Sequence, residues 1–142
     1  MGLRIFAVGR VRKPEWRALI DDYSSRISHY VRCEVIEFKD DNDLIRHHPE
    51  GDIIVSLEVT GSCLSSTEFA QKLESWSRCG QGRVAFVIGG TDGIPLAIAR
   101  LANFRLSLSE MTLPHRLARV LLLEQIYRAQ TILRGEPYAR ES

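Results

Sequence analysis

Residues 104–133 read FRLSLSEMTLPHRLARVLLLEQIYRAQTIL, and this stretch decides the fold. Its first five residues, 104–108, have the pattern of a short strand. Residues 109–114 follow as a loop that ends in proline, and a helix is predicted from about His115 to Leu133. The apolar residues of that helix spread around most of its circumference. We therefore expect it to be buried on more than one side, either inside the core or in a subunit interface.

The segments before this stretch alternate between strands and helices. Short apolar runs predict strands at 4–8, 33–38, 52–57 and 83–88. Helical spacing of apolar residues predicts a helix at 16–30. A capping box of Ser65 and Glu68 predicts the start of a helix at 65–78, and an early proline predicts one at 95–102. The polar segment 39–51 is predicted to be a loop with about one helical turn. This alternation predicts an α/β fold, with a mostly parallel sheet and helices on both faces.

Length and composition indicate one ordinary folded domain. The chain has 142 residues, of which 44% are hydrophobic and 26% are charged, values that exclude intrinsic disorder and collagen-like sequence. No apolar run reaches the ~18 residues of a membrane span, and the N-terminus lacks the pattern of a signal peptide. The three cysteines have no metal-binding spacing and are interpreted as reduced thiols. We therefore expect a cytoplasmic protein with a single domain over residues 1–142.

The chain is almost neutral overall, but most of its cationic residues are arginines. The formal net charge is +1, so a strongly basic nucleic-acid binder is not indicated. Among the 19 cationic residues, only Lys13, Lys39 and Lys72 are lysines. Arginine is well suited to phosphate contacts and to stacking on bases, although a bias in genomic base composition explains the same excess more simply.

Three loops follow successive predicted strands and are candidates for a binding site. They are residues 57–61, 89–93 and 109–114. In an open parallel sheet, ligands bind beyond the carboxyl ends of the strands, so these loops form one pocket if they are adjacent. Leu57, Met111 and Leu113 could then enclose a flat apolar ring such as adenine. Ordinary turn glycines are the alternative explanation for each loop taken alone.

Known phosphate and metal motifs do not fit the chain. Gly89-Gly90-x-x-Gly93 has neither the spacing of the dinucleotide fingerprint nor the lysine of a Walker loop. The pair His47-His48 has no matching acidic or cysteine partner, and we assign no metal. His115 opens the last predicted helix, where its ring could reach the third loop, although a histidine at a helix start is more often structural.

Several segments together resemble one known family. They are Ala7-Val8-Gly9, Phe86-Val87-Ile88-Gly89-Gly90, LSLSEMTLPH at 106–115, RVLLLEQIYRA at 119–129 and RGEPY at 134–138. This pattern, which covers most of the chain, closely resembles the RlmH family, small SPOUT-class methyltransferases that act on a pseudouridine of large-subunit ribosomal RNA. The resemblance implies a homodimeric α/β fold whose C-terminal trefoil knot holds S-adenosyl-L-methionine in a bent conformation.

The resemblance also implies roles for individual residues. The positions it assigns to the cofactor are Leu57, Gly89, Leu108, Ser109, Glu110, Met111, Thr112 and Leu113. The positions it assigns to substrate and catalysis are Arg128, Tyr138 and Arg140. The family's tail usually reads Pro-Tyr-His, whereas Ala139 stands here, so a histidine role cannot be transferred; Arg140 or His115 could compensate. The segment between Phe38 and Asp52 is also shorter than in the family.

The function predicted on this basis is S-adenosylmethionine-dependent methylation of N3 of a pseudouridine in 23S ribosomal RNA. The methyl group of the cofactor is electrophilic, so the main task of the enzyme is to align N3 with it and to stabilise the N3 anion. The near-neutral charge favours the assembled ribosome as substrate over naked RNA. The alternative is a non-catalytic RNA-binding or ribosome-assembly module that retains the fold. A nucleotide-binding oxidoreductase is a weaker alternative, because the fingerprint is absent.

Overall fold

The computed structural model describes residues 1–140 and contains one parallel sheet of five strands. The strands are β1 (Gly2–Val8), β2 (Arg32–Phe38), β3 (Ile53–Cys63), β4 (Arg83–Ile88) and β5 (Phe104–Ser107). Their order in the sheet is β2-β1-β4-β3-β5, and each pair of neighbouring strands is parallel. The predicted α/β class with a parallel sheet is confirmed.

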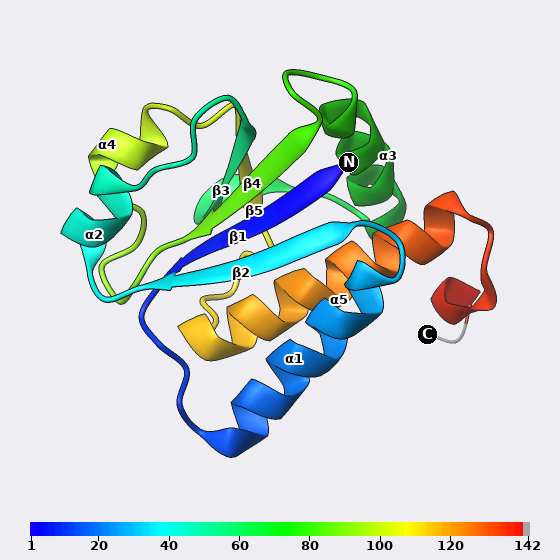
Figure 1. The fold of residues 1–142 in the computed structure, drawn as a ribbon, viewed down its shortest axis with the longest axis horizontal. Helices are drawn as coiled ribbons and strands as arrows, with labels where there is room; N and C mark the ends of the chain where they lie inside the picture. Colours follow the sequence, from blue (N-terminus) through cyan, green and yellow to red (C-terminus); the bar gives the residue numbers. More distant parts are fainter. Residues whose placement is uncertain (141–142) are drawn as a thin grey trace.

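Helices cover both faces of this sheet, as predicted (Figure 1). The helices are α1 (Pro14–Ser28), α2 (Asp41–Arg46), α3 (Ser66–Ser77), α4 (Leu96–Ala99), α5 (His115–Leu133) and the 3-10 turn η1 (Pro137–Arg140). Alternate residues of β4 separate the two faces. Phe86 packs in the core that contains residues of α1, α3 and α5, whereas its neighbour Val87 packs with Leu44 of α2 and Ile98 of α4.

Local sequence signals explain where several helices begin. The Ser65 hydroxyl accepts a hydrogen bond from the Glu68 backbone N–H, and the Glu68 carboxylate accepts one from the Ser65 N–H, so the predicted capping box is present. The Asp40 carboxylate caps α2 in the same way, by accepting from the Asp43 N–H. Segment 39–51 thus contains one short helix, close to the predicted single turn.

Two predicted boundaries are wrong. The strand predicted at 52–57 continues to Cys63, so residues 58–61 belong to β3 and do not form a loop. Its pairing with β5 shifts register between Leu57 and Ser62, and Gly61 passes so close to the Arg105 backbone that a Cβ atom would lie 2.7 Å from the Arg105 carbonyl oxygen. The helix predicted at 95–102 is only the four residues of α4.

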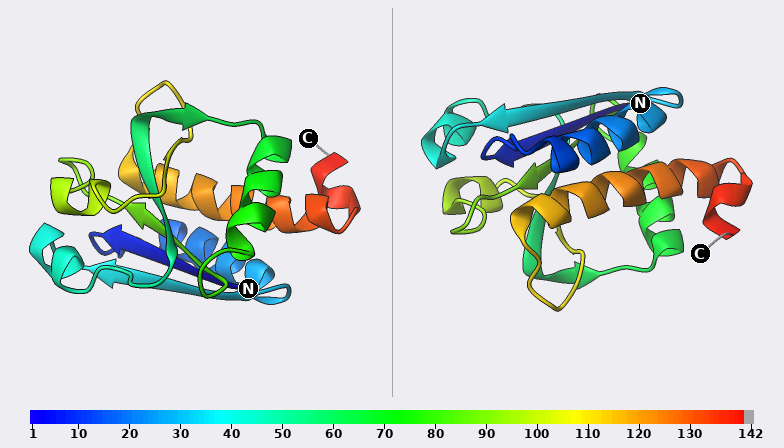
Figure 2. Two further views of the ribbon diagram at one scale, coloured as in Figure 1. Left: turned by 90° about the horizontal axis from the view of Figure 1, so that it is seen from above. Right: turned by 90° about the horizontal axis from the view of Figure 1, so that it is seen from below.

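The broad apolar surface of α5 is buried within the chain. Helix α5 lies alongside α1 and α3 and beneath the sheet (Figure 2). Leu122, Leu123 and Ile126 have no exposed surface. The structure therefore supports the core alternative for this helix. The excess of apolar residues on α5 no longer argues for a subunit interface.

The structure describes the state of the cysteines and the candidate metal ligands. Cys33, Cys63 and Cys79 are free thiols. Within residues 1–140 there is no group of three or more side chains placed to hold a metal ion. None of the helices in the same range combines the length and apolar character needed to cross a bilayer.

Candidate functional site

A cavity of about 260 Å³ lies beyond the carboxyl ends of β4 and β5 and beside the middle of β3. The segments that line it are residues 57–59 of β3, the loop 89–93 and the loop 108–113, together with the first turn of α5. The structure thus brings together the three segments that the sequence suggested as one pocket. The predicted cofactor residues that line it are Leu57, Gly89, Leu108, Ser109, Met111, Thr112 and Leu113. Glu110 is not among the lining residues.

The walls of the cavity are mainly apolar and the third loop is held by its own serines. Leu57, Leu106 and Leu113 contribute apolar side chains. The Ser107 hydroxyl donates to the Ser109 carbonyl oxygen at 2.9 Å, and the Met111 N–H donates to Ser109 Oγ at 2.9 Å. These bonds fix the loop before a ligand arrives. A flat apolar ring with a few polar groups is the kind of ligand that such a pocket fits.

The packing of the 89–93 loop itself requires glycine at position 89. A Cβ atom there would overlap the carbonyl group of Gly93 and would lie 2.7 Å from the Ile94 nitrogen. Gly90 and Gly93 form a β-bridge in the same loop, and Gly93 has a φ of 81°. A larger residue at position 89 would therefore disrupt the loop first, so Gly89→Val does not measure ligand contact alone.

His115 lies at the edge of this cavity. Its ring lines the pocket from the first turn of α5. Partial burial lowers the pKa of His115, and the nearby guanidinium groups of Arg119 and Arg116 lower it further. The neutral imidazole is the favoured form, and it can accept or donate a hydrogen bond inside the pocket.

The lowered pKa of His115 predicts a pH dependence of stability. Because the folded-state pKa lies below the unfolded value of about 6.5, the unfolded chain binds more protons under acidic conditions. The contribution of the neutral His115 imidazole to stability is fully present above the unfolded-state pKa. It is lost as the pH falls through that pKa towards the folded-state pKa. His115→Gln should reduce the loss of unfolding free energy between about pH 7 and pH 5 in urea titrations. An unchanged loss, equal to that of the exposed-site control His29→Gln, would contradict the prediction.

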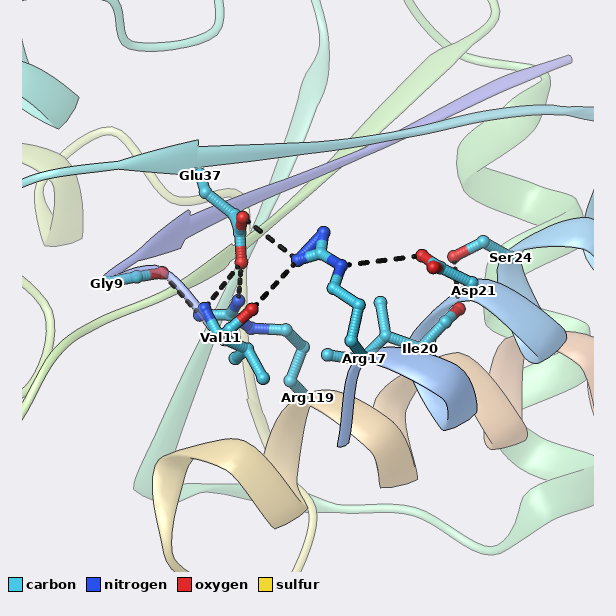
Figure 3. Close-up of polar contacts among 8 residues, drawn as sticks. All are labelled: Gly9, Val11, Arg17, Ile20, Asp21, Ser24, Glu37 and Arg119. Atoms are coloured by element: carbon cyan, nitrogen blue, oxygen red, sulfur yellow. Dashed lines mark hydrogen bonds and ion pairs between the residues drawn. The ribbon is translucent and has the colours of Figure 1, made fainter. Parts of the chain in front are cut away.

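A buried ion pair holds the first turns of α5 against β1 and β2 (Figure 3). The Arg119 side chain is fully buried, and its Nη1 donates to Glu37 Oε2 at 2.6 Å while Nη2 donates to the Gly9 carbonyl oxygen at 3.0 Å. Glu37 also accepts from the Val11 N–H and from Arg17 Nη1. These contacts join β2, the loop after β1 and α1 to the helix that carries His115 and Ala118 of the cavity wall.

The three residues predicted for catalysis lie around the other end of α5. Arg128 Nη2 donates to Glu124 Oε2 at 2.8 Å, and the Tyr138 hydroxyl donates to the same oxygen at 2.8 Å. The Arg128 guanidinium lies over the Tyr138 ring at 4.9 Å. Partial burial and the bond to Glu124 raise the pKa of Tyr138, so its hydroxyl stays protonated. Arg140 is exposed and donates to the Gly135 carbonyl oxygen at 3.5 Å.

Within one protomer, the cluster of Arg128, Tyr138 and Arg140 does not lie at the cavity. Helix α5 runs from the edge of the sheet where the strands end to the edge where they begin, and the turn η1 lies beside its far end (Figure 1). His115 and Arg128 are 13 residues apart on this helix, a separation of about 20 Å along its axis. The cavity residues and the Arg128 cluster are therefore two separate sites on one protomer.

Two important residues were not predicted as site residues. Glu124 is not among the predicted site residues, yet its carboxylate joins Arg128 and Tyr138. Its position four residues before Arg128 is the signal that could have identified it. Glu37 carries no comparable signal, because it lies 82 residues from Arg119 in sequence.

The fold is shared with known methyltransferases. The SpoU methyltransferase AviRb from Streptomyces viridochromogenes, solved in complex with AdoMet, superposes with a TM-score of 0.54 at 12% identity, over 89% of this chain and 57% of that chain. At this identity the likeness defines the class of fold, that of the SpoU and SPOUT methyltransferases.

Sequence comparison places the chain within that class. Residues 1–139 match the family model described as predicted SPOUT methyltransferase, and the chain belongs to this family. Ribosomal RNA large subunit methyltransferase H of Sorangium cellulosum is 46% identical over 98% of this chain and 99% of its own length. The protein of the same name from Acetivibrio thermocellus is 40% identical over 99% and 100%. The resemblance to the RlmH family is confirmed.

Proposed function

We propose that this protein transfers the methyl group of S-adenosyl-L-methionine to N3 of a pseudouridine in 23S ribosomal RNA. The observation that carries the proposal is the cavity formed by β3, the 89–93 loop and the 108–113 loop in a chain of the SPOUT methyltransferase family. The names of relatives that are 40% and 46% identical over nearly the whole chain support ribosomal RNA as substrate. We further propose that residues 1–142 act as one SPOUT-type domain in the cytoplasm.

The residues of the cavity fit the proposed cofactor. Leu57 and Leu113 would lie against the adenine ring, and the backbone of the loop 108–113 would provide hydrogen-bonding groups for its polar edge. A neutral His115 adds no positive charge beside a cofactor that carries a sulfonium and an ammonium group. The bound cofactor would supply an electrophilic methyl group, so the protein needs neither a covalent intermediate nor a metal.

Cofactor binding at this cavity predicts a clear effect of Leu113→Ala. Removing apolar contacts with the ring should weaken S-adenosylmethionine affinity at least about tenfold, the equivalent of about 1.4 kcal/mol. The matched control is Leu96→Ala, since Leu96 is 65% exposed on α4 and does not line the cavity. Isothermal titration calorimetry measures both. Equal affinity for the two variants would contradict the assignment.

The cluster at the far end of α5 fits the substrate side of the reaction. N3 of a neutral pseudouridine carries a proton that must pass to solvent before N3 can attack the methyl group, and a nearby cation favours this loss because it stabilises the N3 anion. Arg128 provides a permanent guanidinium, which Glu124 holds in place through Nε and Nη2. Tyr138 offers a ring for stacking and a protonated hydroxyl, and Arg140 offers a second exposed cation.

The separation of the two sites along α5 favours a homodimer. About 20 Å of helix lies between the cavity and the Arg128 cluster, too far for direct methyl transfer between groups on one protomer. We propose that the Arg128, Tyr138 and Arg140 of one copy approach the cavity of the other. A trefoil knot in the segment around β5 and α5 belongs to the same proposal, since it follows from the family and not from the contacts described above.

A non-catalytic RNA-binding or ribosome-assembly module is the second candidate function. Ala139 favours it, because the family's tail usually carries histidine at that position. The intact cavity weighs against it, since such a module has no use for a cofactor pocket. Calorimetry with S-adenosylmethionine separates the two functions: saturable binding supports the enzyme, and absence of binding by the folded protein supports the module.

A further inference from the structure

Three cationic side chains lie close together in the loop between β1 and α1. Arg10, Arg12 and Lys13 are exposed, and their side chains make no hydrogen bond or ion pair with any of residues 1–140. Several arginines on the helices are instead neutralised by a carboxylate one turn away, as Arg78 is by Glu74 at 2.7 Å. The loop therefore presents positive charge that the chain itself does not use.

The backbone of this loop is fixed from beneath (Figure 3). The Gly9 carbonyl oxygen accepts from Arg119 Nη2 at 3.0 Å. Val11 is buried, its N–H donates to Glu37 Oε2 at 3.0 Å, and its carbonyl oxygen accepts from Arg17 Nη1 at 3.3 Å. Because Val11 is held inward through both backbone groups, its two neighbours in the chain face solvent. A loop fixed in this way loses little conformational freedom when it binds a partner.

The same bonds place the loop beside the cofactor cavity. It follows the carboxyl end of β1, which is parallel to the neighbouring β4. Arg119, which binds the Gly9 carbonyl oxygen, comes directly after Ala118 of the cavity wall. A methyl acceptor must come to this cavity, because the reacting groups have to meet there. RNA on one side of the acceptor base therefore comes close to the loop.

We propose that Arg10, Arg12 and Lys13, here called the basic loop, bind phosphate groups of the ribosomal RNA beside the target nucleotide. The inference rests on the proposed function, which brings the target base to the cavity. Phosphate contacts position a nucleic acid without reading its sequence, and the planar guanidinium group binds phosphate oxygens in pairs. The basic loop thus supplies a local docking point for RNA in a chain whose net charge is only +1.

The acidic residues near the basic loop give this contact a direction. The Glu37 carboxylate is already bonded on the inner side of the loop, and Glu15 is an exposed acid in the first turn of α1. Asp40, Asp41 and Asp92 line a separate hollow at the end of β1, on the side of α2. That hollow repels phosphate, so the RNA backbone should pass on the side of the basic loop.

The test compares the double variant Arg10→Ala/Arg12→Ala with Arg100→Ala. Arg100 is the matched control, because it is exposed and its side chain has no hydrogen bond or ion pair within residues 1–140. It lies at the end of α4, which covers the other face of the sheet. Cosedimentation with ribosomes at several salt concentrations should show an affinity about tenfold lower for the double variant. Its salt slope should be smaller by about 1.5, as expected for two lost phosphate contacts.

Two further measurements separate phosphate binding from a structural effect. The charge-conserving variant Arg10→Lys/Arg12→Lys should keep the salt slope of the wild type. In methylation assays, the alanine variant should raise the KM for ribosomes and leave kcat unchanged at saturation. The control should bind ribosomes as the wild type does. All four proteins should have the same melting temperature and the same S-adenosylmethionine affinity, because neither arginine of the basic loop lines the cavity.

Four other outcomes would decide differently. Unchanged ribosome binding by the alanine variant would overturn the proposal, and so would weaker binding with an unchanged salt slope. A lower molecular mass than that of the wild type in sedimentation equilibrium would also overturn it, since the basic loop would then join two copies of the chain. Ribosome binding that depends on the basic loop, in a wild-type protein that transfers no methyl group, would support the loop and refute the proposed enzymatic function.

Discussion

Replacing Arg128 with alanine should lower the kcat for ribosomal RNA methylation at least about a hundredfold, the usual effect of removing one group that stabilises a developing anion. S-Adenosylmethionine affinity should not change, because Arg128 does not line the cavity. Arg78→Ala is the control, since its ion pair with Glu74 has the same i,i+4 spacing and a similar length, 2.7 Å against 2.8 Å. Single-turnover methylation of ribosomes measures the effect. Equal rates for the two variants would remove Arg128 from the mechanism.

The same variant tests whether the site is shared between two copies. If Arg128 acts on the cofactor bound to the partner, a mixture of Arg128→Ala with a cofactor-binding variant such as Leu113→Arg should regain about a quarter of wild-type activity after subunit exchange. In that mixture, half of the dimers would be mixed, and each would carry one complete site. No recovery, although mixed dimers are present, would show that each protomer works alone.

Replacing Arg119 with methionine should lower the free energy of unfolding by about 3–5 kcal/mol. The change leaves Glu37 without its shortest ion-pair contact, 2.6 Å, and leaves the Gly9 carbonyl oxygen without the Arg119 donor. Arg17→Met is the matched control, because Arg17 contacts the same carboxylate but is 37% exposed, and it should lower the free energy of unfolding by less than about 1 kcal/mol. Urea unfolding measures both variants.

A double variant separates the charge from the packing at this position. Glu37→Gln with Arg119→Met removes both charges, so it should be more stable than Arg119→Met alone. Arg119 Nε is buried with no hydrogen-bond partner among residues 1–140, a further cost that methionine does not have. A double variant no more stable than the single one would show that shape, and not the unpaired carboxylate, determines the loss.

The fold was largely predictable because its signals are local. Apolar runs with a glycine or polar end identified the strands, and the capping box of Ser65 and Glu68 marked the start of α3. The extension of β3 to Cys63 was missed because Thr60-Gly61 has the composition of a turn, whereas the backbone there pairs closely with β5. Tertiary pairing overrode the local preference.

The candidate site was predictable where the sheet determines its position. Carboxyl ends of parallel strands lie at one edge, which places the loops with Gly89 and Leu113 together, and Leu57 joins them because it follows the last residue of β3 that pairs with β4. No such rule connects Glu37 with Arg119, or Tyr23 with Tyr127, because these contacts depend on how α1 and α5 pack. The sequence also gives no measure of the distance between the cavity and Arg128.

The contacts of the C-terminal tail, from Pro137 onward, could not be predicted from the sequence. Tyr138 was predicted only as a substrate or catalytic residue, but it also packs edge-on against Tyr127 and donates to Glu124. Residues 141–142, the end of the predicted tail, lie outside the described residues. Deletion of the whole tail would therefore disturb α5 as well as the substrate side. Single substitutions are the sharper tests.

Methyl transfer to isolated ribosomes tests the central claim most directly. Ribosomes from a strain that lacks the gene for this protein are incubated with the purified protein and isotope-labelled S-adenosylmethionine, and the 23S ribosomal RNA is digested and analysed by mass spectrometry. The proposed function predicts one labelled methyl group on N3 of a pseudouridine, absent without protein and restored to wild-type occupancy with it. Saturable cofactor binding without label in ribosomal RNA, or label on a different base, would contradict it.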